Sequence, residues 1–216
     1  QAICGDPMAV FLSKSITQEV TGQTKQLVNP GLVMNISIGQ STAATQRVIA
    51  NLFYKNVAIQ RFVQKNETLQ TVVKVRGLSD LRQRSDRPAR GLVLLGIETI
   101  CLDSGETVVD YERCAMLLAR NHKRETSHTD NIGQANPIIN LDEWITYVPT
   151  NWDLSPLAMA SNRDWNAGNR YTDPLRDTVT DPLLLVRLTQ NQALPHRDPA
   201  QGVNNNRLIY GGHTIG

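Results

Sequence analysis

Three long apolar segments in succession, within residues 68–118, most constrain what this chain can fold into. In residues 69–76, apolar and polar side chains alternate, which is the pattern of a strand with one buried face. Residues 92–102 form a long apolar run, and residues 107–118 resume a strand pattern after the turn sequence Asp-Ser-Gly-Glu at 103–106. The sequence therefore predicts three long antiparallel strands.

A short apolar segment precedes these strands. Residues 32–39 read Leu-Val-Met-Asn-Ile-Ser-Ile-Gly and are expected to form a buried helix, although a run this short also fits a strand. Residues 49–62 contain two further strand-like apolar patches. A helix followed by long antiparallel strands predicts an α+β fold, in which a twisted sheet curls around the helix.

The composition excludes several classes of protein. The net charge is +2 over 216 residues, whereas nucleic-acid-binding domains usually carry a clear basic excess. The cysteines Cys4, Cys101 and Cys114 are far apart and form no CxxC, so neither a disulfide framework nor a zinc site is expected. We therefore expect a protein of the reducing cytoplasm, and no apolar run approaches the roughly 18 residues that span a membrane.

The residues best suited to chemistry lie near the end of the sequence. His196 can exchange a proton near neutral pH, and Asn191 lies five residues before it. Residues 182–194 are expected to form a helix that Asp181 caps and that breaks at Pro195. Such a break could direct both side chains to one cavity, where an amide can orient a water molecule or an imidazole. The alternative is that His196 is a structural or surface histidine.

A glycine pair follows this histidine. Gly211 and Gly212 would let the backbone approach a ligand closely, and His213 would line the same place. If a helix begins there, its free N–H groups could stabilise the oxygen of a carbonyl or thioester as it gains negative charge. The alternative is an ordinary turn. No metal site is expected, because His122 and His128 have no partners at ligand spacing.

Residues 188–198 and 207–216 resemble the MaoC-like, (R)-specific enoyl-CoA hydratase family. Its motif, Gly-Asp-x-Asn-Pro-(Leu/Ile/Val)-His, aligned on His196, places Asn191 at the position of the aspartate. Residues 207–216, Arg-Leu-Ile-Tyr-Gly-Gly-His-Thr-Ile-Gly, are similar to the double hot-dog branch, which includes mesaconyl-CoA hydratase-like proteins. Near the start, Asp6 would match the motif aspartate of a degenerate first copy, with Phe11 at the histidine position.

The resemblance implies a double hot-dog protein in three parts. We expect a degenerate first unit at residues 1–120, a linker at 121–138, and at 139–216 the start of a second unit that carries the motif. Because the sequence starts with glutamine and ends where a helix is expected to begin, we expect it to be a piece of a longer protein. Two hot-dog units in one chain would mimic the usual hot-dog dimer, and a homodimer of the chain is a further possibility.

The function that the resemblance implies is an acyl-CoA hydratase or dehydratase. The substrate would be a CoA thioester, with no cofactor, nucleic acid or membrane involved. His196 would handle the proton of water, Asn191 would hold that water or the imidazole, and Gly211 and Gly212 would polarise the thioester. A non-catalytic acyl-CoA or acyl-carrier binding module and a thioesterase are the alternatives. The arginines at positions 82, 84, 87 and 90 either lie in a solvated hairpin loop or contact CoA phosphates.

Overall fold

A four-stranded antiparallel sheet, in the order β1-β4-β3-β2, forms the centre of the molecule. The computed structural model describes residues 6, 8–120, 126–135, 141–157, 166–170, 172, 182–201 and 208. The strands are β1 (Val48–Ile59), β2 (Leu69–Asp80), β3 (Arg90–Cys101) and β4 (Thr107–Leu118). The three strands expected within residues 68–118 are confirmed, each to within about two residues.

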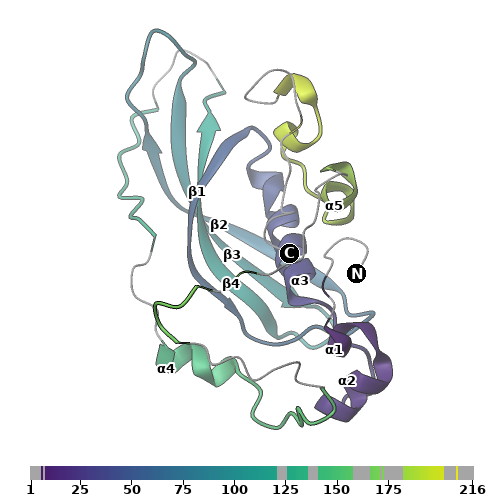
Figure 1. Cartoon of the computed structure of the whole chain (residues 1–216). Helices are drawn as coiled ribbons and strands as arrows, with labels where there is room; N and C mark the ends of the chain where they lie inside the picture. The colour runs from purple at the N-terminus through teal and green to yellow at the C-terminus, as the bar shows by residue number, and fades with distance from the viewer. Residues whose placement is uncertain are drawn as a thin grey trace.

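The buried helix expected at residues 32–39 is also confirmed, and it is longer than its apolar run. Helix α3 extends over Pro30–Ser41 and continues into a 3-10 turn, η1 (Thr42–Ala44). Asn29 caps it by accepting a hydrogen bond from the Leu32 N–H at 3.0 Å, and proline suits the first helical position because it lacks an N–H. Figure 1 shows α3 on the concave side of the curved sheet.

The main hydrophobic core lies between α3 and the sheet. Met34 and Ile38 of the helix pack against inward-facing side chains of β1, β3 and β4. Its buried members on the strands are Val48, Val93, Leu95, Ile97, Val109, Tyr111 and Ala115. Alternation along the strands therefore places one face of each on the helix, as expected of a hot-dog unit.

Short elements surround this unit. Helices α1 (Ala9–Leu12) and α2 (Lys14–Thr21) precede α3, and α2 ends at Gly22, whose φ of +71° is easily adopted by glycine. Farther along the chain, α4 (Leu141–Trp144) continues into the 3-10 turn η2 (Ile145–Tyr147). No helix among the described residues is long and apolar enough to cross a membrane.

Part of the expected linker lies along the edge of the sheet. The Asp80 N–H donates to the His128 carbonyl at 2.8 Å, and the Asp130 N–H donates to the Leu78 carbonyl at 3.0 Å. Ile132 is buried against Leu94 and Cys114. Residues 126–132 therefore cover part of the free edge of β2, which reduces its capacity to pair with another chain.

The helix expected at residues 182–194 is shorter than predicted. Helix α5 spans Pro182–Leu188, and Gln190 adopts a left-handed conformation with φ of +58°. The Gln190 N–H donates to the Arg187 carbonyl and the Asn191 N–H to the Val186 carbonyl. This pair of bonds is a Schellman ending, so the helix stops before Asn191. The expected cap, Asp181, lies outside the described residues.

Candidate functional site

The segment that carries Asn191 and His196 is bound by hydrogen bonds to the region between α3 and β1. The Gln192 N–H donates to Thr42 Oγ1 at 2.7 Å, and the Leu194 N–H donates to the Gln46 carbonyl at 2.8 Å. Gln46 Nε2 also donates to Gln192 Oε1 at 3.0 Å. The segment is therefore held where α3 ends and β1 begins.

Close packing supports this attachment. A Cβ at Gly39 of α3 would lie 2.0 Å from the Thr189 carbonyl oxygen, so the two backbones meet where only glycine fits. Ala193 has no exposed surface and belongs to the main core. The segment thus contributes a buried side chain to the core between α3 and the sheet.

Asn191 is buried, with 6% of its surface exposed. Its Oδ1 accepts a hydrogen bond from the Ala193 N–H at 2.9 Å, which shapes the turn after α5. An amide has one acceptor and two donor hydrogens, so Nδ2 is the part of the side chain able to donate to water or an imidazole.

His196 ends the 3-10 turn η3 (Leu194–His196) and is partly exposed. Its backbone N–H donates to the Ala193 carbonyl at 3.1 Å. Asp198, the nearest carboxylate in sequence, is exposed and accepts the Ala200 N–H at 3.0 Å, so it caps the local turn. The expected thioester-binding residues Gly211, Gly212 and His213 lie outside the described residues.

Asp6 and Phe11, the two residues that the resemblance aligns with a first copy of the motif, lie near the start of α3. Asp6 Oδ2 accepts a hydrogen bond from Nδ2 of Asn29, the residue that caps the helix, at 2.5 Å. Asp6, Phe11, Asn29 and Lys65 line one cavity of about 200 Å³. The family resemblance aligns Asp6 with the motif aspartate and Phe11 with the motif histidine, so this cavity has a carboxylate and no imidazole at these two positions.

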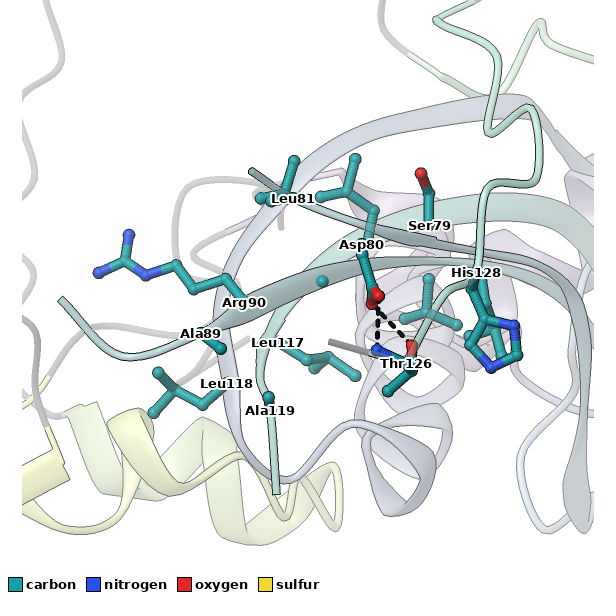
Figure 2. A pocket seen from close by; sticks show the side chains of 14 residues that line it. Ser79, Asp80, Leu81, Ala89, Arg90, Leu117, Leu118, Ala119, Thr126 and His128 are labelled. Carbon is teal, nitrogen blue, oxygen red and sulfur yellow. Dashed lines mark hydrogen bonds between the residues drawn. The ribbon is translucent and has the colours of Figure 1, made fainter. Parts of the chain in front are cut away.

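A second cavity, of about 240 Å³, opens between the β2–β3 hairpin and residues 126–128. Figure 2 shows the Asp80 carboxylate directed at Thr126, with His128 beside it and Arg90 extending away. The carboxylate accepts hydrogen bonds from the Thr126 N–H and hydroxyl and from the Ser127 N–H, at 2.6–2.7 Å. The Thr126 hydroxyl is the largest of the influences that hold the pKa of Asp80 below its ordinary value. Sequence patterns gave no sign of this cluster.

The arginine cluster expected either in a solvated loop or against phosphates lies mainly on the surface. Arg82, Arg84 and Arg87 are exposed between β2 and β3, and Arg84 pairs with Asp86 at 3.2 Å. Arg90, at the start of β3, lines the cavity of Figure 2.

Polar side chains are also buried beneath α3. Thr99 Oγ1 donates to Ser37 Oγ at 2.6 Å, and Ser37 bonds to the Tyr111 hydroxyl at 3.2 Å. Burial raises the pKa of Tyr111 to about 12. Arg113 is 1% exposed and donates to Thr45 Oγ1 at 2.9 Å. Sequence reasoning missed Thr99 and Arg113, because a polar side chain inside a strand is usually assigned to the exposed face.

Comparison with known proteins shows similarity to two solved structures over nearly the whole chain. A conserved hypothetical protein of Mycobacterium tuberculosis with a double hot-dog fold is 32% identical, with a TM-score of 0.81 over 100% of this chain and 65% of that one. A Chloroflexus aurantiacus protein described as a MaoC domain dehydratase is 23% identical, with a TM-score of 0.65 over 99% of this chain and 62% of that one. The chain thus spans slightly less than two thirds of each protein.

No family model matches the sequence, and no curated protein matches it either. The similarity is therefore one of structure: a sheet curved around α3, and a likeness to a double hot-dog protein along the full chain. These features, with the MaoC domain protein as a second neighbour of the same fold, show that the chain has the hot-dog fold of these proteins.

Proposed function

We propose that the protein adds water to the double bond of an enoyl-CoA thioester, or removes it in the reverse direction, with His196 as the proton-transfer residue. The observation that carries this proposal is the attachment of residues 189–196 to the first unit. Two hydrogen bonds donated by backbone N–H groups and the close packing at Gly39 fix the turn that ends in His196. A fixed position is what a catalytic base requires.

The proposed reaction conserves atoms and charge. His196 takes a proton from water as the water oxygen bonds to the β-carbon of the enoyl group, and negative charge develops on the thioester oxygen. The protonated imidazole then returns a proton to the α-carbon, which closes the cycle. We propose that N–H groups near Gly211 and Gly212 stabilise the charged oxygen.

Asn191 would assist His196 but would not replace it as the catalytic base. Its Oδ1 is engaged by the Ala193 N–H, and an amide cannot act as an anionic base. The Nδ2 group would orient the attacking water or the imidazole. We therefore expect slower turnover than a site with a carboxylate at this position would give.

The amide at position 191 also favours a second candidate function, an acyl-CoA binding module without turnover. Asn191 stands where the motif has an aspartate, and its buried amide serves the local turn. A protein that had lost the catalytic carboxylate would keep the fold and the thioester pocket.

Hydration of crotonyl-CoA and mesaconyl-CoA by the full protein distinguishes the two candidates. We expect turnover that falls at least about 100-fold in His196→Ala, which is the usual contribution of a general acid or base. His128→Ala is the matched control and should retain turnover, because His128 lies at the β2 edge. No turnover on either substrate, with tight CoA-ester binding by calorimetry, would favour the binding module.

A further inference from the structure

Two adjoining cavities lie away from His196, where residues 141–152 pack against the end of β1. The apolar cavity has a volume of about 410 Å³ and is lined mainly by hydrophobic side chains, among them Val57, Ala58, Ile59, Trp144 and Val148. The polar cavity has a volume of about 420 Å³. Both volumes fall within the roughly 300–1,000 Å³ of small-molecule sites, whereas the cavity of Figure 2 is smaller, at about 240 Å³.

The two cavities share one wall. Phe62, Tyr147 and Pro149 line both of them. Phe62 also contacts Trp152 of the polar cavity, with ring centroids 4.7 Å apart. A single elongated molecule could therefore occupy both cavities across this aromatic wall.

The polar cavity is lined by several amide side chains and by more carboxylates than cationic groups. Gln23, Gln60 and Gln64 line it, and Gln64 Nε2 donates to Gln23 Oε1 at 2.8 Å. Glutamine side chains offer both donors and acceptors to a ligand. They suit a neutral head group with hydroxyl or amide functions.

The charges of the polar cavity disfavour an anion. Arg61 pairs with Glu67 at 2.8 Å and with Glu106 at 3.0 Å, so one cation faces two carboxylates. The Glu106 side chain is 64% exposed, and its charge is therefore available to a ligand head group. This surplus negative charge would repel a carboxylate or the phosphates of CoA.

We propose that the two cavities form one binding site for an uncharged amphiphile. Its hydrocarbon or aromatic part occupies the apolar cavity, and its neutral, hydrogen-bonding head contacts the glutamines of the polar cavity. The site is separate from His196 and takes a ligand of different charge from a CoA thioester, so it does not depend on the proposed hydratase activity.

Binding of monooctanoylglycerol to the full protein tests the proposal, with octanoate as the anion of equal chain length. Trp144 and Trp152 line the two cavities, so tryptophan fluorescence reports occupancy, and calorimetry gives Kd. We expect the neutral ester to bind at least about tenfold more tightly than octanoate, as one desolvated charge interaction permits. Glu106→Gln should narrow this difference several-fold, because octanoate should bind more tightly once the carboxylate is removed.

Two substitutions test the apolar cavity. Ala58→Phe fills it and should weaken binding of the ester by about tenfold or more, whereas Leu52→Phe, at an exposed position of the same strand that lines neither cavity, should not. If Ala58→Phe impairs folding, Val148→Asn gives the same test at a side chain that is 58% exposed. Binding that is absent, unaffected by the cavity variants, or equally strong for octanoate would overturn the proposal. Loss of ester binding in His196→Ala would show that the two sites are not separate.

Discussion

Asn191 is the residue at which local structure and chemistry conflict. Its Oδ1 shapes the turn after α5 by accepting the Ala193 N–H, while the family resemblance aligns it with a catalytic aspartate. Either an amide or a carboxylate oxygen can accept this hydrogen bond. Only the carboxylate could also act as a base.

We therefore expect Asn191→Asp to raise hydration turnover by about tenfold or more, and to lower the free energy of unfolding by about 1–3 kcal/mol because the new carboxylate would be buried. Stopped-flow or steady-state hydration of crotonyl-CoA, together with a urea melt, measures both quantities. Asn191→Leu serves as the control, because it removes the acceptor for the buried Ala193 N–H. That variant should lose about 1–2 kcal/mol of stability, and a gain of turnover in it would argue against the proposed role.

Asp80 shows how a single carboxylate attaches a segment to the sheet edge. It accepts three hydrogen bonds from Thr126 and Ser127, which lower its pKa in the folded protein. A depressed folded pKa means that the stabilising contribution is fully present above the unfolded pKa. It is lost as pH falls through the folded pKa.

We expect the amide resonances of Thr126 and Ser127 to shift together as the solution is acidified, with a midpoint below the usual pKa of an aspartate. An NMR titration measures this transition. Asp80→Asn keeps an acceptor oxygen but cannot titrate, so the transition should be absent from that variant. A midpoint at or above the ordinary value would contradict the assigned hydrogen bonds.

At the scale of elements, Gly39 determines whether residues 189–196 can lie on α3. Alanine in a helix usually gains about 1 kcal/mol over glycine. Here the added Cβ would lie 2.0 Å from the Thr189 carbonyl oxygen, and this backbone contact cannot be relieved by rotation of a side chain. The steric cost should therefore exceed the gain in helix propensity.

We expect Gly39→Ala to destabilise the protein by about 2 kcal/mol and to speed hydrogen exchange in residues 189–196 more than in β3. The rate of hydration should also fall in this variant, because the turn that ends in His196 would no longer be fixed. Exchange measured by mass spectrometry resolves the two regions. A stabilised variant with unchanged exchange would show that the two backbones are not in close contact.

The short apolar run at residues 32–39 fitted either a helix or a strand, whereas local sequence patterns were sufficient to predict the three long strands. Their apolar periodicity reflects burial on one face, and turn residues mark their ends. The same reasoning predicted too long a helix before His196, because residues 182–194 are mostly apolar, whereas the helix ends in a left-handed residue at Gln190. Glutamine at that position gives no glycine-like stop signal.

At the scale of the whole molecule, the candidate site depends on contacts that a sequence pattern does not contain. The hydrogen bond from the Gln192 N–H to Thr42 Oγ1 joins residues 150 positions apart. Family resemblance indicated Asn191 and His196, but nothing in their neighbourhood indicated that Ala193 would enter the core of the first unit. The buried Arg113 and the hydrogen-bond cluster of Asp80 were likewise beyond reach.

We propose that the functional site lies where residues 189–196 meet α3 and the start of β1. A crystal structure of the full protein with butyryl-CoA, which lacks the double bond and cannot be hydrated, tests it most directly. We expect the β-carbon of the acyl group to lie within reach of His196, directly or through one water molecule at about 3 Å from the imidazole. A thioester bound elsewhere, such as in the cavity lined by Asp80 and His128 or at Asp6, would contradict the claim.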